Sequence, residues 1–157
     1  MLEKIREPNL PTTIYDLNSF GDRHKLALPA RYVSFLLENN GGRPVPAAFP
    51  IQGLADNPFG IIKVFFGINT EIDTENLEYV LVEECENINV PKGILPIAST
   101  DCGDFLCIDL RKSECPIVFW DRKPSWGNNI WNEADLYPVA ESFETLLETL
   151  FEFQFAP

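Results

Sequence analysis

Four aspartates in the second half of the chain come closest to a catalytic pattern. Asp101 and Asp104 lie on either side of Gly103. Asp109 lies near the end of the apolar run 105–110, and Asp121 directly follows the run 117–120. Converging carboxylates could act as a general acid and base, or could hold Mg²⁺. A structural explanation competes with this chemistry, because short acidic side chains beside a glycine accept backbone N–H bonds in turns. We expect Asp101 and Asp104 to shape a turn, and we keep a small enzyme using all four carboxylates as a third hypothesis.

The other reactive side chains form no familiar site. A hydrolase pairs its nucleophile with a base, but His24 is the only histidine and no Gly-x-Ser-x-Gly segment occurs. We expect His24 in an exposed loop. Cys85, Cys102, Cys107 and Cys115 lack the short paired spacings of zinc ligands, so we interpret them as reduced thiols that fill space. The sequence predicts no catalytic residue, no metal site and no cofactor.

Two helices are predicted at the start of the chain. Thr13 can cap a short helix that Gly21 ends. Pro29 suits the first position of a second helix, because the N–H that proline lacks would be unpaired there. Gly41 can adopt the left-handed conformation that closes it. Apolar residues recur in both segments at the three- and four-residue spacing of a buried face.

Four apolar runs have the length and composition of strands, at residues 61–66, 77–82, 105–110 and 117–120. A polar connection of hairpin length separates the last two, which predicts antiparallel neighbours. Phe105 and Cys107 project away from Leu106 and Ile108, so this strand is apolar on both sides and should lie centrally. Four prolines in residues 41–60 argue against regular strand pairing there.

An apolar stripe near the end of the chain predicts a C-terminal helix that packs on the sheet, formed by Val139, Phe143, Leu146, Leu147, Leu150 and Phe151. The predicted fold is therefore α+β, a largely antiparallel sheet with two N-terminal helices and one C-terminal helix packed on one side. We expect residues 1–11 to be an N-terminal extension and residues 12–157 to be a single domain.

Membrane association is not expected. No run approaches the roughly 20 apolar residues of a membrane span, and the first residues are too charged for the apolar part of a signal peptide. We expect a cytoplasmic protein.

Several short motifs occur in a characteristic order. They are Leu28-Pro29-x-x-Tyr32-x-x-Phe35-Leu36, Asn40-Gly41-Gly42, Leu95-Pro96-Ile97-Ala98 before Gly103-Asp104, Phe119-Trp120-Asp121, and Ser142-Phe143. Together they resemble the SUKH superfamily, which includes bacterial toxin-immunity proteins and the Smi/Knr-type domain of a fungal regulator of cell-wall glucan synthesis. This resemblance implies a non-catalytic domain that binds a protein, with polymorphic toxins, often nucleases, among the partners.

The acidic residues concentrate in two blocks. Asp and Glu number 24 against 12 Lys and Arg, a formal net charge of -12. No Lys or Arg lies between Lys63 and Lys92, where seven acids occur, and none follows Lys123, after which six more acids occur. Such blocks repel nucleic-acid phosphates and attract basic proteins. Acidic surfaces also serve solubility alone, and this explanation stays open.

The candidate protein-binding residues combine these acids with two tryptophans of a turn-rich segment. Exposed Trp often anchors a partner, although both rings could instead fold back over the sheet. The predicted set is Glu71, Asp73, Glu75, Glu78, Trp126, Trp131, Glu144, Glu148 and Glu152. The leading hypothesis is an immunity protein that blocks a basic toxin domain stoichiometrically, and the alternative is a regulatory or scaffold module that binds an endogenous protein. The sequence predicts neither the oligomeric state nor which face binds.

Overall fold

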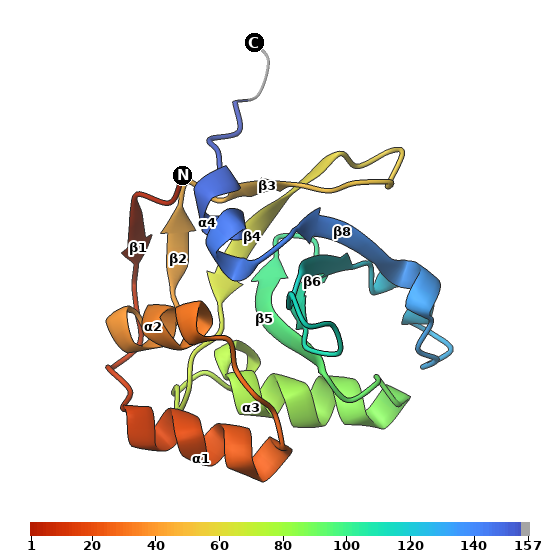
Figure 1. The fold of residues 1–157 in the computed structure, drawn as a ribbon. Helices are drawn as coiled ribbons and strands as arrows, with labels where there is room; N and C mark the ends of the chain where they lie inside the picture. Colours follow the sequence, from red (N-terminus) through yellow and green to blue (C-terminus); the bar gives the residue numbers. More distant parts are fainter. Residues whose placement is uncertain (155–157) are drawn as a thin grey trace.

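A curled sheet of six antiparallel strands organises the computed structural model, which describes residues 1–154 (Figure 1). Every neighbour in the sheet is also the next strand along the chain, so the topology is a meander. The strands in spatial order are β3 (Ala48–Pro50), β4 (Phe59–Phe65), β5 (Ile94–Thr100), β6 (Phe105–Asp109), β7 (Ile117–Trp120) and β8 (Leu136–Ala140). The predicted α+β class with a largely antiparallel sheet is confirmed.

The remaining elements surround this sheet. Strands β1 (Lys4–Arg6) and β2 (Arg43–Val45) form a separate antiparallel pair. The helices are α1 (Ile14–His24), α2 (Ala30–Glu38), α3 (Leu77–Tyr79) and α4 (Phe143–Thr149). Helix α3 continues directly into a π-helix (Val80–Cys85) and a 3₁₀ turn (Glu86–Ile88). None of the helices in residues 1–154 has the length and apolarity needed to cross a membrane.

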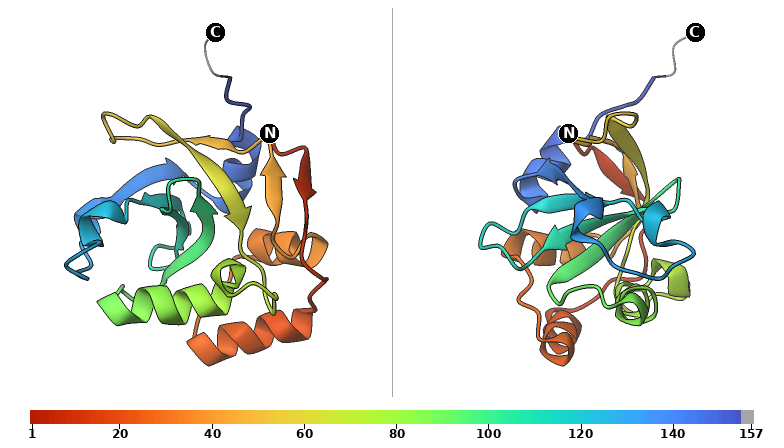
Figure 2. Two further views of the ribbon diagram at one scale, coloured as in Figure 1. Left: turned by 180° about the vertical axis from the view of Figure 1, so that it is seen from behind. Right: turned by 90° about the vertical axis from the view of Figure 1, so that its right-hand side faces the viewer.

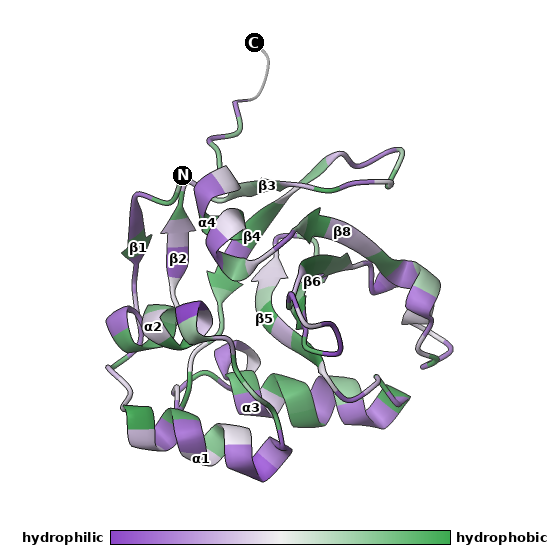
Figure 3. Cartoon of the chain, in the orientation of Figure 1, coloured by the Kyte–Doolittle hydropathy of each residue, from purple (hydrophilic) through white to green (hydrophobic). Residues whose placement is uncertain are grey.

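The two faces of the sheet are covered by different helices, as the side view in Figure 2 shows. Phe65, the last residue of β4, packs against Phe35 of α2 and Phe143 of α4 at ring distances of 5.0 and 6.1 Å. The next residue, Phe66, contacts Phe105 of β6 at 5.7 Å. Successive residues of an extended chain point to opposite sides. The sheet therefore has a core on each face, and in Figure 3 its strands β4 and β6 are coloured mainly as hydrophobic.

The central strand was predicted correctly. All five residues of β6 are buried, and β6 lies between β5 and β7. It pairs with β7 in the expected hairpin, with Phe105 opposite Trp120. At the far edge, the N–H of Gln52, two residues beyond β3, donates to the Pro138 carbonyl of β8 at 3.0 Å. The sheet thus curls until its two outer edges approach each other.

Several element predictions were wrong, and each has a physical cause. Residues 77–82 are helical, because Asn76 caps a helix there and Leu77 and Val80 turn to the same buried side. The proline-rich segment contains β2 and β3, since short strands at edges tolerate proline. Val139 belongs to β8 and not to the last helix, which begins only after the Ser142 cap. Helix α1 runs through Gly21 to His24, so His24 is half-buried in a helix and not in an exposed loop.

The first residues of the chain are integrated with the rest. Strand β1 pairs with β2, the Met1 amino group donates to the Leu150 carbonyl, and the Leu2 N–H donates to the Leu147 carbonyl at 2.7 Å. The N terminus accordingly lies beside α4 in Figure 1. The division into a residue 1–11 extension and a residue 12–157 domain stays a prediction, and residues 155–157 lie outside the described residues.

Candidate protein-binding surface

The first acidic block lies on the helical stretch that covers one face of the sheet. We call residues 71–86 the acidic segment. The Asn76 side chain accepts a hydrogen bond from the Tyr79 N–H at 3.0 Å and so caps α3. Leu77, Val80 and Cys85 are buried against the sheet. The acids between them are therefore left on the outer side of this stretch.

Basic residues from distant parts of the chain neutralise three of these acids. Glu75 pairs with Arg43 at 3.4 Å, and Glu84 pairs with Arg122 at 2.7 Å. Glu78 accepts from Arg23 at 2.8 Å and lies 2.9 Å from the His24 ring nitrogen. The Arg23 hydrogen bond is the main reason that the pKa of Glu78 falls below its ordinary value, with His24 adding to it.

Four acids of the segment keep an uncompensated charge. Among the ion pairs of residues 1–154, none involves Glu71, Asp73, Glu83 or Glu86, and all four are exposed. The acidic segment thus presents free carboxylates to solvent, while its paired acids hold it against the body of the protein.

A groove of about 480 Å³ runs between the acidic segment and the sheet. Ile72, Thr74, Glu75, Val80 and Glu84 line one wall. Lys63, Val64, Ser99, Thr100 and Phe105 line the sheet side, and Arg43, Asp101, Gly103 and Arg122 complete the lining. Three basic and three acidic residues therefore meet in the groove, so its interior is close to charge balance, and the four free acids of the acidic segment are not part of its lining.

Arg122 fixes one end of this groove. Its guanidinium lies 4.0 Å from the centroid of the Phe105 ring, a cation–π contact, and it donates to the Gly103 carbonyl at 3.1 Å. Its backbone N–H donates to the buried Asp104 carboxylate at 2.9 Å, and Lys123 contacts the same carboxylate at 2.6 Å. These contacts anchor the start of the turn-rich segment that follows β7.

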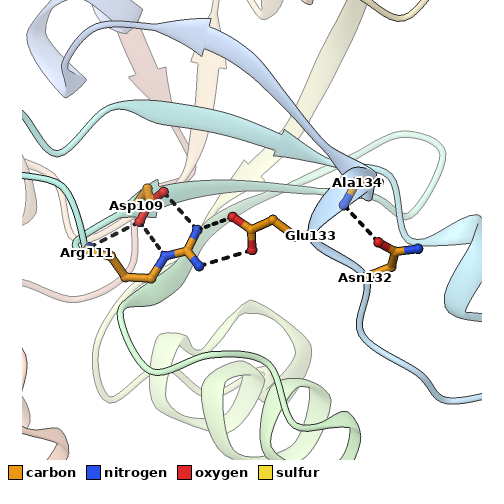
Figure 4. A network of polar contacts seen from close by, with 5 residues as sticks. All are labelled: Asp109, Arg111, Asn132, Glu133 and Ala134. Carbon is orange, nitrogen blue, oxygen red and sulfur yellow. Dashed lines mark hydrogen bonds and ion pairs between the residues drawn. The ribbon is translucent and has the colours of Figure 1, made fainter.

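A second network anchors the end of that segment (Figure 4). Arg111 bonds the buried Asp109 carboxylate through Nε at 2.9 Å and Nη2 at 3.1 Å. The same guanidinium binds Glu133 at 2.7 and 3.0 Å. Next to Glu133, the Asn132 side chain accepts from the Ala134 N–H at 2.9 Å. Residues 123–132 are therefore a loop held firmly at both ends.

The two tryptophans of this loop differ in placement. The Trp131 ring packs against Trp120 at 5.1 Å in an edge-on arrangement and is partly buried. Trp126 is 52% exposed and lies beside Gly103, at the end of the groove. Ile130, which the sequence did not single out, is 62% exposed on the same loop. Trp131 thus takes the folded-back position considered above, whereas Trp126 remains open to solvent.

The second acidic block lies elsewhere. Glu144 and Glu148 are exposed on α4, which lies on the opposite face of the sheet from the acidic segment. Helix α4 ends at Thr149, so Glu152 follows it and does not continue its face. The structure brings Glu75 into the lining of the groove and places Trp126 next to Gly103 of that lining. It leaves Glu71 and Asp73 beside the wall and turns Glu78 toward α1. It does not unite these residues with Glu144, Glu148 or Glu152.

The four candidate catalytic aspartates do not converge. Asp104 precedes β6 and Asp109 ends it, so the strand separates the two carboxylates, and each has its own basic partner. Lys123 lies 3.8 Å from Asp121 as well, while Asp101 is exposed at the groove. No group of three potential metal ligands occurs within residues 1–154. Asp104, Asp109 and Asp121 therefore anchor turns and loops, whereas the Asp101 carboxylate makes no hydrogen bond or ion pair within residues 1–154.

The sequence reasoning missed the basic residues of this surface. Arg43 and Arg122 lie 32 and 38 positions from the acids that they bind. Only the fold brings such residues together, although Arg122 does follow directly after the Phe119-Trp120-Asp121 motif.

A comparison with protein families yields one match. The profile of the SMI1 / KNR4 family (SUKH-1) matches residues 11–149. The match begins before α1 and ends with the last residue of α4, so it includes the groove and both acidic blocks up to Glu148. No curated protein matches the chain.

Proposed function

The chain belongs to the SMI1 / KNR4 family (SUKH-1), and from this we propose that it is an immunity protein that neutralises a cognate toxin by binding it stoichiometrically. Members of this family are in general immunity or regulatory domains that bind protein partners. The proposed mechanism is steric and electrostatic blockade of the toxin, with no chemical step by this chain.

The observation that carries the proposal is the groove, with the free acids Glu71 and Asp73 beside one wall and the exposed Trp126 next to Gly103 of its lining. The exposed carboxylates of Glu71 and Asp73, on either side of the lining residue Ile72, create a negative rim. Complementary charge accelerates encounter with a basic partner and disfavours acidic competitors. Trp126 offers a large rigid ring at low entropic cost, the type of residue that commonly dominates binding energy.

A nuclease toxin is the partner class that this rim fits best. A nuclease surface that binds phosphates is basic, and each Lys or Arg that contacts a phosphate contributes to its affinity. Carboxylates placed opposite those residues would compete with the nucleic acid. The paired acids Glu75 and Glu84 would remain bound to Arg43 and Arg122, so the free acids would form the contacts.

The decisive experiment is co-expression with a candidate toxin domain encoded beside this chain. We expect the chain to restore growth and to co-purify with the toxin at equal stoichiometry. Failure of both results would remove the assignment to that toxin. If the chain instead co-purifies with an endogenous protein and leaves toxin-treated cells unprotected, the regulatory module becomes the function.

Two charge-matched variants locate the interface. Glu71→Lys with Asp73→Lys alters free acids of the acidic segment, and Glu144→Lys with Glu148→Lys changes the net charge by the same amount on α4. We expect the first pair to slow association about tenfold at low salt and to weaken its salt dependence, with a smaller effect from the second. A larger effect from the α4 pair would move the interface to α4.

The tryptophan is tested separately. Trp126→Ala should weaken binding by roughly 2 kcal/mol, about thirtyfold, mostly through faster dissociation. Ile130→Ala, an exposed neighbour on the same anchored loop, provides the comparison. Unchanged affinity in the Trp126 variant would exclude this end of the groove from the interface.

A further inference from the structure

A second cavity lies on the other side of the acidic segment, where α1 ends. Its volume is about 340 Å³, within the range of pockets that hold small molecules. The end of α1, residues 81–86 and the residues that lead into β5 form its walls. Leu26, Leu81, Cys85, Val90 and Ile94 give it an apolar lining, in which Cys85 and Ile94 are almost fully buried. Burial raises the pKa of the Cys85 thiol to about 12, so this thiol is neutral.

The rim of the pocket is mainly basic, opposite in sign to the net charge of the whole chain. Acids outnumber bases two to one in the whole chain, but the pocket is lined by Arg23, His24, Lys25 and Lys92 against one carboxylate, Glu86. Arg23 and His24 are engaged by Glu78. Lys25 and Lys92 have no ion-pair partner within the described part of the chain, and both are exposed. They are the free cations of this rim.

Two carbonyls in the last turn of helix α1 are paired within the chain. A helix C-terminus repels anions through its unpaired carbonyls. Here the Gly21 carbonyl accepts from the Leu26 N–H at 2.9 Å, and the Asp22 carbonyl accepts from the Lys25 N–H at 3.4 Å. Lys25 itself takes the left-handed conformation of a helix-closing residue, with φ of 54°. The Gly21 and Asp22 carbonyls, two of the last four of α1, are thus already paired.

We propose that this pocket binds an amphipathic carboxylate, a medium-chain acid whose chain lies on the apolar lining and whose carboxylate faces Lys25 and Lys92. This site is separate from the groove and does not depend on the proposed toxin partner. The chain of such an acid is matched by the apolar side chains of the lining, and its single charge is matched by two free ammonium groups.

Titration of the full chain with sodium octanoate tests the proposal. We expect saturable binding at one site, with affinity rising up to about fourfold per added methylene from hexanoate to octanoate, as burial of each CH₂ predicts. We expect 1-octanol, of equal chain length and no charge, to bind at least fivefold more weakly. Equal binding of the acid and the alcohol, or no saturable binding of octanoate, would overturn the proposal.

Substitutions at the rim should act in opposite directions. Lys25→Glu and Lys92→Glu should each weaken octanoate binding several-fold while leaving 1-octanol unaffected. Lys4→Glu, the same charge change on β1, which does not line the pocket, should alter neither. Glu86→Gln should tighten octanoate binding by roughly 1.5- to 5-fold, the usual size of an exposed charge interaction. Val90→Trp, which fills the pocket, should abolish binding of both ligands. If Lys4→Glu weakened binding as much as the rim variants, overall charge and not this pocket would explain the affinity.

The groove variants provide the last control. Glu71→Lys with Asp73→Lys should leave octanoate affinity unchanged, because these residues do not line the pocket. Loss of octanoate binding in that variant would contradict a separate site, whatever its effect on the toxin.

Discussion

Asn40 joins three segments that are distant in the sequence. Its Nδ2 donates to the carbonyls of Leu10 at 2.9 Å and Ile68 at 2.8 Å, and its Oδ1 accepts from the Ile68 N–H at 2.8 Å. The next residue, Gly41, has φ of 76°, and a Cβ atom there would lie 2.6 Å from the Phe65 carbonyl oxygen. The Asn40-Gly41-Gly42 motif thus ties the end of α2 to the end of β4 and does more than close a helix.

Removing this side chain should destabilise the fold strongly. Asn40→Ala leaves the buried Ile68 N–H and carbonyl without partners, and we expect the free energy of unfolding to fall by about 2–4 kcal/mol. Asn39→Ala, one residue earlier and only half-buried, should change it by less than about 0.5 kcal/mol. Urea denaturation followed by tryptophan fluorescence measures both. A loss below about 1 kcal/mol in Asn40→Ala would contradict the role assigned to this residue.

Asp109 gives the stability a predictable pH dependence. Burial pushes the pKa of Asp109 upward, but hydrogen bonds from the Arg111 side chain and backbone N–H outweigh it, so the pKa lies below its ordinary value. The ionised form therefore stabilises the fold above the unfolded-state pKa, about 4. That contribution is lost as the pH falls below about 4 and through the folded-state pKa.

Arg111→Met should reverse the direction of the Asp109 pKa shift and its effect on stability. The carboxylate would stay buried without its cation, its pKa would rise, and at pH 7 we expect a loss of about 2 kcal/mol, moderated because Arg111 is 30% exposed. The difference from the unmodified chain should shrink as the pH falls toward 4, because the variant regains stability when Asp109 takes up its proton. Arg31→Met, at an exposed position of α2, is the matched control. A difference that is constant between pH 7 and pH 4 would contradict this account.

At the level of elements, the stretch that follows Asn76 shows where local pattern and tertiary structure disagree. Val80 and Val82 favour a strand by composition, since β-branched residues fit a pleated surface. The helix forms because Asn76 supplies a cap and because Leu77 and Val80, three residues apart, meet the same buried face. A cap residue followed by that spacing is the signal that the sequence analysis passed over.

The cap makes this stretch a test of local stability. Asn76→Ala should cost about 1 kcal/mol, which corresponds to about fivefold faster amide exchange in residues 77–85. Exchange in β6 should change less, because the central strand opens only with the whole sheet. Asn18→Ala, on the exposed side of α1, should leave residues 77–85 unaffected. Unchanged exchange in that segment after Asn76→Ala would show that packing alone holds the helix.

On the scale of the whole molecule, the sequence predicted what depends on near neighbours. The Thr13 cap of α1, the β6–β7 hairpin and the central place of β6 follow from short-range pattern, and each was found. The predicted helix ends were wrong, because α1 continues through Gly21 and α2 ends at Glu38, before Gly41. The groove did not follow, because its lining comes from segments between Arg43 and Arg122 that only the folded sheet brings together. The two acidic blocks were recognised as charge, but their separation onto opposite faces is a property of the topology.

Because of the same excess of acidic residues, we expect added salt to stabilise the protein. The formal net charge is -12, and a large net charge destabilises the compact state through self-repulsion. At 0.1 M salt, exposed charges more than about 10 Å apart are largely screened from one another. Added salt should therefore weaken the long-range repulsion among the free acids. We therefore expect the Tm to rise by about 2–4 °C between low salt and roughly 0.3 M NaCl, equivalent to about 1 kcal/mol for a chain of this size.

Glu148→Lys separates repulsion from nonspecific salt effects. Glu148 follows Glu144 by four residues and lies in the last turn of α4, where a negative charge is unfavourable for the helix. We expect this variant to raise the Tm at low salt and to lose most of that advantage at high salt, whereas Lys112→Glu should do the reverse. If added NaCl instead lowered the Tm of the unmodified chain, attraction within its ion pairs, such as Arg111 with Asp109 and Glu133, would outweigh the repulsion among its free acids.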